Sequence, residues 1–207
     1  MNSNWNLRQA IVAILFAAGL LPSVASSHIP IPPKEPSEIG RRVVKKIVAD
    51  FKLIDQEGKP FKFDSTRGKL VLVTFIFTTC PDVCPLLTAK LAAVQRKLEE
   101  NKTRDYLLLS ITTDPERDTS AALKEYAHQF KADFHNWSFL TGSRQELAKV
   151  WKLFGVNVTK NQSGQVQHTS LTTLIDREGT RRVDYYGDKW QEKEVVKDIE
   201  WLASVKK

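Results

Sequence analysis

The strongest pattern along the chain is the apolar run Leu70–Phe77, which is rich in β-branched and aromatic residues. A continuous apolar run of this length predicts a strand that is buried on both faces. Directly after it, four apolar residues recur at the spacing of one helix face: Leu87, Leu91, Val94 and Leu98. The pattern therefore predicts a buried strand that leads into a helix, and the helix runs to about Lys102.

The same two periodicities predict the other elements. Strands are expected at Ile47–Ile54 and Phe61–Phe63, as a hairpin, and at Tyr106–Ile111, Trp137–Leu140, Ser170–Asp176 and Arg181–Tyr186. Helices are expected at Ser120–Phe130, Arg144–Phe154 and Lys193–Ser204. Polar connecting segments are expected at Glu38–Lys46 and Asn157–Gln165.

Strands and helices alternate after the first hairpin, and a late hairpin precedes the last helix. Alternation predicts a partly parallel sheet with helices on both faces, and the late hairpin makes the sheet mixed. The two cysteines, Cys80 and Cys84, stand at the first strand-to-helix junction. We therefore predict an α/β, thioredoxin-like fold: a central mixed β-sheet flanked by helices, with an N-terminal β-hairpin. Sites in open α/β sheets gather at the carboxyl ends of strands, where this pair lies.

The start of the chain is typical of an export signal. Arg8 precedes the apolar run Ala10–Leu21, and Ser23-Val24-Ala25 has the small-x-small pattern of a cleavage site. We expect residues 1–25 to be a signal that is cleaved or kept as an anchor, residues 26–45 to be a Pro-rich linker and lead-in, and residues 46–207 to be one domain. The protein is then periplasmic, either secreted or anchored to the inner membrane and facing the periplasm.

Composition and charge exclude few classes of binding partner. The 207 residues carry a formal net charge of +7, without a long Lys/Arg block. Nucleic-acid binding has no supporting motif. Scattered positive charge is typical of a solvated surface. It is also compatible with binding to an acidic partner or to an anionic membrane.

The cysteine pair can support two chemistries. If the first helical turn includes both residues, their spacing of four places the sulfurs on one side, and the positive helix N-terminus favours thiolates. Thiolates bind soft metals and also attack disulfides. A structural disulfide is the weaker interpretation, because so short a loop contributes little entropic stabilisation.

Of the four histidines, His168 is the best candidate to complete a site. It stands where the chain enters the strand Ser170–Asp176, in a segment that packs against the cysteine loop in a thioredoxin-like sheet. His128 is expected on a helix and His135 in a loop. Two thiolates and an imidazole suit copper, whereas zinc, iron–sulfur clusters and covalent haem need ligands or motifs that are absent.

Asp114–Thr119 is a further motif, Asp-Pro-Glu-Arg-Asp-Thr. The structural interpretation is a turn followed by a helix cap at Asp118 or Thr119. The alternative is a rim of charges beside the metal loop, in which Arg117 and Asp118 meet a partner.

The sequences around Cys80 and Cys84, the Asp114–Thr119 motif and His168 together resemble the SCO/SenC family of copper chaperones, in order and in separation, over about Lys46–Ser204. The resemblance implies a thioredoxin-like fold and copper binding through Cys80, Cys84 and His168. It also implies delivery of copper to the CuA centre of cytochrome c oxidase, or reduction of that centre's cysteines. Family members commonly carry an acidic residue before the histidine, where this chain has Gln167.

We therefore predict a monomeric metallochaperone whose partner is the CuA-bearing oxidase subunit or another copper or thiol protein. The alternative is a periplasmic thiol–disulfide oxidoreductase with Cys80 as nucleophile. Against it, the chain has no proline after Pro115, so the proline that faces the cysteines of thioredoxins is missing. A thiol peroxidase with Thr78 or Thr79 beside Cys80 is weaker still, because no arginine partner is evident. If cleavage follows Ala25, Ser26-Ser27-His28 would offer a second, amino-terminal Cu(II) site.

Overall fold

A computed structural model of the protein describes residues 40–162 and 164–205. Its strands are β1 (Arg41–Ile47), β2 (Lys52–Ile54), β3 (Pro60–Lys62), β4 (Leu70–Ile76), β5 (Tyr106–Thr112), β6 (Trp137–Leu140), β7 (Val158–Lys160), β8 (Val166–His168), β9 (Leu171–Ile175) and β10 (Thr180–Tyr186). Its helices are α1 (Val83–Glu100), α2 (Ser120–Gln129), α3 (Arg144–Phe154) and α4 (Glu192–Ser204), with a short 3-10 turn at Phe63–Thr66. The expected signal and most of the expected linker lie outside the described residues.

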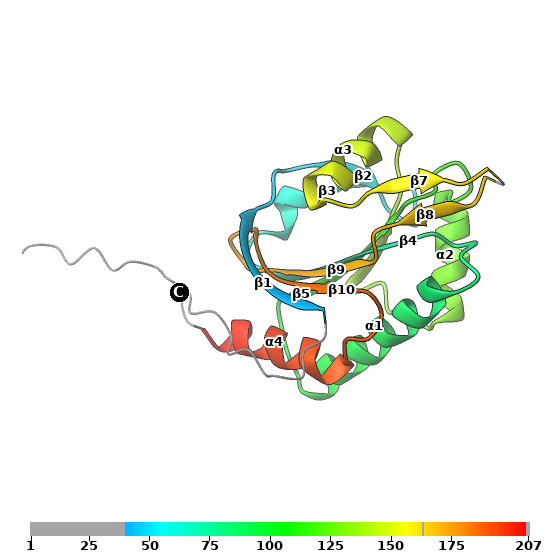
Figure 1. Ribbon diagram of the computed structural model, residues 1–207. Coiled ribbons are helices and arrows are strands. Elements are labelled where there is room, and N and C mark those ends of the chain that lie inside the picture. The colour runs from blue at the N-terminus through cyan, green and yellow to red at the C-terminus, as the bar shows by residue number, and fades with distance from the viewer. Residues whose placement is uncertain (1–39, 163, 206–207) are drawn as a thin grey trace, which may run out of the picture.

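A six-stranded mixed sheet forms the centre of the molecule, in the order β1-β10-β9-β4-β5-β6. Strands β4, β5 and β6 are parallel, while β9 runs antiparallel to β4 and β10. Helices α1 and α4 cover one face of the sheet and α3 covers the other (Figure 1). This is the helix-flanked mixed sheet of a thioredoxin-like fold, as the sequence predicted.

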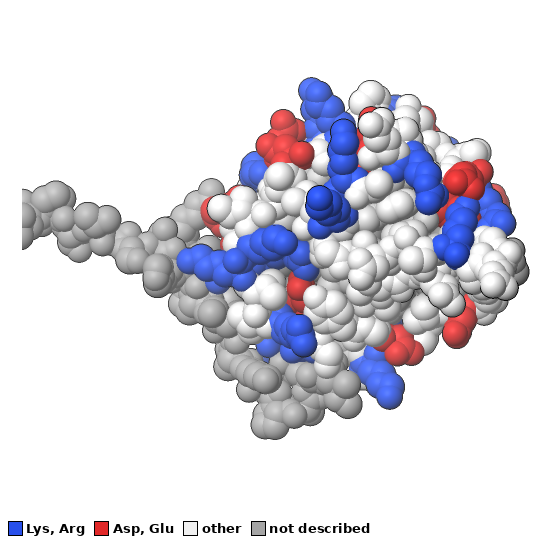
Figure 2. Space-filling model, turned by 45° about the horizontal axis from the view of Figure 1, so that its top comes forward, with Lys and Arg blue, Asp and Glu red and all other residues white. Residues whose placement is uncertain are grey.

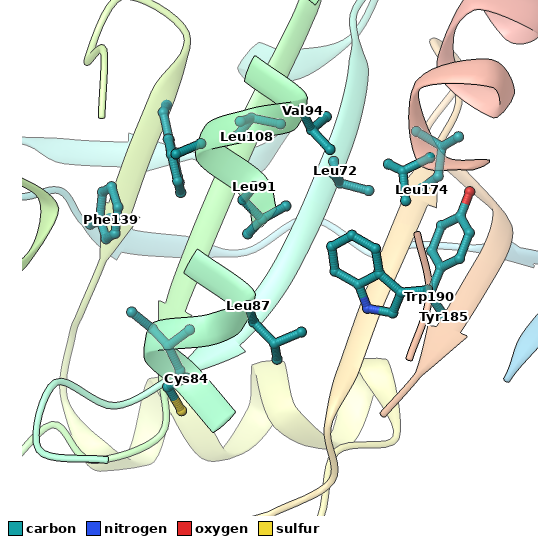
Figure 3. Close-up of a cluster of buried hydrophobic side chains, with 14 of the residues drawn as sticks. Leu72, Cys84, Leu87, Leu91, Val94, Leu108, Phe139, Leu174, Tyr185 and Trp190 are labelled. Atoms are coloured by element: carbon teal, nitrogen blue, oxygen red, sulfur yellow. The ribbon is translucent and has the colours of Figure 1, made fainter. Parts of the chain in front are cut away.

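Strand β4 is buried along its whole length, because both faces of the sheet are covered. Alternate residues serve opposite sides: Leu72 packs with α1 and α4, whereas Val73 packs with α3. Figure 3 shows the first of these clusters, in which Leu87, Leu91 and Val94 of α1 meet the sheet and Cys84 lies at one end. The apolar periodicity thus sets the helix face that anchors the cysteine motif.

One strand of the main sheet differs from the expectation. Residues 38–46 were expected to be a polar lead-in, but β1 pairs antiparallel with β10 at the sheet edge. The reason lies far away in the chain: Arg41 is buried against the carboxylate of Asp198, with nitrogen–oxygen distances of 2.8 Å. A buried arginine at a strand start carries no local apolar signal, so the pattern missed it.

Two further segments also differ. The first hairpin is shorter than expected, since only β2 and β3 pair. The expected polar loop Asn157–Gln165 instead contributes to a second hairpin, in which β7 pairs with β8 outside the main sheet. Val158 and Val166 are the only apolar residues of these two strands, which is too few for a periodicity to be visible.

Candidate metal centre

The topology brings three segments to one edge of the sheet. Strands β4 and β5 are parallel, so the cysteine loop after β4 and the loop after β5 emerge side by side. Strand β9 is antiparallel to β4, with Thr172 opposite Thr74, so the residues just before β9 lie at the same edge. His168 ends β8, immediately before β9, and therefore reaches the cysteine loop.

The two cysteines occupy different settings. Helix α1 begins at Val83, so Cys84 lies in its first turn while Cys80 precedes the helix. The condition that both belong to that turn is therefore not met. Both are free thiols; Cys84 is fully buried and Cys80 keeps 9% of its surface exposed.

Burial, and not the helix N-terminus, dominates the chemistry of Cys84. Desolvation raises the pKa of its thiol well above the usual range, and the neighbouring Cys80 and Asp118 raise it further. A hydrogen bond from the backbone at Phe77 opposes this rise and is the smaller effect. The expectation of a thiolate stabilised by the helix is therefore wrong for Cys84 in the metal-free protein.

His168 faces the Cys84 sulfur. Its Nε2 lies 3.9 Å from Cys84 Sγ, and its Nδ1 lies 3.0 Å from the Thr169 carbonyl oxygen. A carbonyl can only accept, so Nδ1 carries the proton and the Nε2 lone pair is directed at sulfur. Burial lowers the pKa of His168, which keeps the imidazole neutral. The Phe77 ring packs edge-on against it, with centroids 5.8 Å apart.

The Asp114–Thr119 motif is built differently from a surface rim. Thr119 caps α2, because its side chain accepts from the Ala122 N–H at 3.2 Å. Asp118 is fully buried and accepts hydrogen bonds from the backbone and hydroxyl of Thr78. Asp118 therefore braces the start of the cysteine loop and cannot meet a partner at the surface. No feature of the sequence pointed to this contact, which joins residues 40 positions apart.

The other histidines stay away from this cluster. His128 and His135 are both exposed, and the ring of His128 packs against Phe134. His28 lies outside the described residues. Within the described chain, no three His, Cys, Asp or Glu side chains come close enough together to form a ready-made metal cage. The structure brings Cys84 and His168 together, and Cys80 lies near enough to affect the pKa of Cys84.

The family model for SCO1/SenC matches residues 40–204 of this chain. The chain belongs to the SCO1/SenC family. That assignment confirms the resemblance inferred from the cysteine, aspartate and histidine motifs, and its range includes β1.

Individual SCO proteins are similar to this chain in sequence and in structure. An SCO2-like protein of Rickettsia prowazekii is 38% identical over 149 residues, covering 69% of this chain and 71% of the relative. The solved structure of copper-bound ScoI from Arabidopsis thaliana has a TM-score of 0.68 and 31% identity, covering 77% of this chain and 99% of that one.

The solved structure of BsSco has a TM-score of 0.70 and 32% identity, covering 80% of this chain and 98% of that one. BsSco is described as having a disulfide switch and as a member of the Sco family of cytochrome c oxidase assembly proteins.

Proposed function

We propose that this SCO-family protein is a copper chaperone that binds copper through Cys80, Cys84 and His168. We propose further that it helps to metallate or reduce the CuA site of cytochrome c oxidase. The observation that carries the proposal is the 3.9 Å approach of His168 Nε2 to Cys84 Sγ, with the Nε2 lone pair turned toward sulfur. The copper-bound ScoI structure and the description of BsSco support it.

The donor set fits copper on chemical grounds. Two sulfurs and one imidazole are soft to intermediate donors, which favour Cu(I) and can also hold Cu(II). The metal-free site holds a neutral Cys84 thiol and a neutral His168, since burial raises one pKa and lowers the other. Each thiol that becomes a ligand must therefore lose a proton. Copper binding should release protons and weaken as the solution becomes more acidic.

The position of His168 suits a site that transfers its metal to a partner protein. The cysteines follow the central strand β4, whereas His168 belongs to the small β7–β8 hairpin outside the main sheet. A ligand on a separate hairpin can be displaced by an incoming partner without disturbing the core. Figure 2 shows Lys and Arg side chains spread over one face of the molecule, in keeping with a partner of opposite charge.

Anaerobic titration with Cu(I) against a competing chelator tests the metal site. The reduced full chain should carry His28→Ala throughout, to remove the amino-terminal histidine. We expect one tightly bound copper, weakened at least about tenfold by His168→Ala and abolished by Cys84→Ser. His135→Ala is the matched control, because His135 is exposed and far from the site in the fold. Equal affinity of the His168 and His135 variants would refute the ligand assignment.

A second function is favoured by the proximity of the two thiols. Cys80 is the more exposed sulfur, so its thiolate would attack a partner disulfide, and Cys84 would then resolve the mixed disulfide. The two cysteines thereby lose two electrons and two protons, and the partner gains two thiols. A redox assay separates this activity from copper binding: His168→Ala should leave disulfide exchange nearly unchanged.

We also propose that residues 1–25 export the protein, so that the domain works in the periplasm, free or held by that segment. Within the described residues, no helix is long and apolar enough to cross a membrane. Mass spectrometry of the mature N-terminus would distinguish cleavage after Ala25 from a retained anchor. It would also decide whether a terminal Ser26-Ser27-His28 exists.

A further inference from the structure

Lys160 ties the β7–β8 hairpin to the loop that follows β5. Its Nζ lies 2.5 Å from Glu116 Oε2 and 3.3 Å from Asp114 Oδ1. Lys160 pairs with Val166 across the hairpin, and Val158 pairs with His168. The ion pairs therefore act on the same two-stranded unit that carries His168.

The contact with Asp114 joins Lys160 to a buried carboxylate. Asp114 is fully buried, and its Oδ1 accepts no hydrogen bond. A buried carboxylate oxygen without a countercharge is costly, so the Lys160 ammonium, 3.3 Å away, has a stabilising role. The Arg117 guanidinium forms an ion pair with the other oxygen of Asp114, Oδ2, at a nitrogen–oxygen distance of 3.1 Å. Glu116 is 59% exposed, and solvent screens its pair with Lys160.

Hydrogen bonds connect the Asp114 loop, which Lys160 contacts, to the cysteine loop. The Asp114 backbone N–H donates to Thr112 Oγ1 at 2.9 Å, and the Thr112 hydroxyl donates to Asp118. Asp118 in turn accepts from Thr78, just before Cys80. A continuous set of polar contacts thus joins the cysteine loop to the histidine hairpin, through a third loop that supplies no ligand.

We infer that Lys160 is a positioning residue, which holds the β7–β8 hairpin against the Asp114–Asp118 segment so that His168 faces Cys84. Its effect on copper rests on the proposed function, whereas its effect on the placement of His168 does not. Without Lys160, the hairpin separates from the buried Asp114 carboxylate, and the His168 ring leaves the edge of Phe77. The metal is then held by fewer ligands and leaves faster.

The first test uses the metal-free reduced protein. Phe77 packs against His168, so its ring current shifts the imidazole proton signals in an NMR spectrum. Lys160→Met removes the charge and keeps the aliphatic chain; we expect these signals to move toward random-coil values. Lys160→Arg should restore them, since an arginine can keep the ion pair. The matched control is Lys124→Met, which removes an exposed 3.0 Å pair with Glu57 elsewhere.

The second test measures the transfer of Cu(I) from the full protein to a chelator in a stopped-flow instrument. Loss of a residue that orients a ligand typically weakens a metal site at least about tenfold, so Lys160→Met should transfer faster by about that factor. Lys124→Met should transfer at the wild-type rate. If the wild-type protein binds no copper, the proposed function fails while the NMR experiment still decides the role of Lys160. Unchanged His168 signals in Lys160→Met would overturn the inference, whatever the copper result.

Discussion

At the scale of single residues, burial decides the chemistry of the candidate site. Cys84 and His168 are both neutral in the metal-free protein, since desolvation disfavours a thiolate and an imidazolium alike. The site is therefore poised to accept a cation by releasing protons. Asp118 illustrates the same effect: burial raises its pKa, while hydrogen bonds from Thr112 and Thr78 oppose the rise.

The Cys84 thiol should alkylate slowly. We expect the Cys80→Ser variant, which keeps only Cys84, to react with iodoacetamide at neutral pH at least about tenfold slower than a free cysteine, because each pKa unit of increase lowers the thiolate fraction tenfold. Mass spectrometry of time points measures the rate. The complementary Cys84→Ser variant keeps the more exposed Cys80 and should react faster. Equal rates for the two variants would contradict the buried, protonated state of Cys84.

The imidazole of His168 should titrate below the ordinary histidine value of 6.5, because burial lowers its pKa. The unfolded chain then takes up the proton first, so the contribution to stability is present above pH 6.5 and is lost as the pH falls toward the folded-state pKa. NMR titration gives the midpoint, and urea unfolding above and below that pH gives the stability. His168→Gln should remove this part of the pH dependence. A midpoint at or above 6.5 would contradict the lowering of the pKa by burial.

At the scale of elements, long-range polar contacts place strands that the apolar pattern does not specify. Strand β1 has a largely polar surface, yet it belongs to the sheet because Arg41 reaches Asp198 on α4. Tyr185 of β10 donates to the same carboxylate, so three elements share one buried charge. The β7–β8 hairpin is likewise held by Lys160 and the Asp114 loop.

Arg41→Met should destabilise the protein by about 3 kcal/mol, because it leaves Asp198 buried without its countercharge. Urea unfolding of the metal-free protein measures the change. Lys45→Met, at an exposed position on the same strand, is the control and should alter stability little. Adding Asp198→Leu to Arg41→Met should recover stability, since it removes the unpaired charge. A neutral effect of Arg41→Met alone would mean that solvent reaches Asp198.

At the scale of the whole molecule, the parallel β4 and β5 and the antiparallel β9 bring the cysteine loop, the Asp114 loop and His168 to one edge of the sheet. The site is assembled only when the sheet is formed, because its parts come from segments far apart in the sequence. A metal that binds the assembled site therefore binds the folded state in preference to the unfolded chain.

Copper should accordingly raise the melting temperature of the reduced protein. Free Cu(I) at a hundred times its dissociation constant adds about 2.7 kcal/mol, if the unfolded chain does not compete. Calorimetry with a Cu(I) buffer measures the shift. His135→Ala should keep the shift and Cys84→Ser should lose it. A shift of the same size in Cys84→Ser would assign the copper to another site.

The regular elements were predictable where local periodicity was strong. Strand β6 and helix α3 match their predicted ranges, and Gly155 ends α3 with a φ of 74°. The turn-and-cap interpretation of the Asp114–Thr119 motif holds at Thr119. Strand β1 and the β7–β8 hairpin were missed, because their pairing depends on distant partners and not on local apolar spacing.

The sequence by itself determined the mixed helix-flanked sheet and the place of Cys80 and Cys84 after its central strand, and it singled out His168 as the proposed ligand among the histidines. These follow from local patterns and from motif order, which the linear chain carries. Only the tertiary structure decided that Cys84 is protonated, that His168 turns Nε2 toward it, and that Asp118 and Lys160 brace the loops on either side. Burial and ion pairing depend on which distant segments meet, and that is set by the packing of the whole sheet.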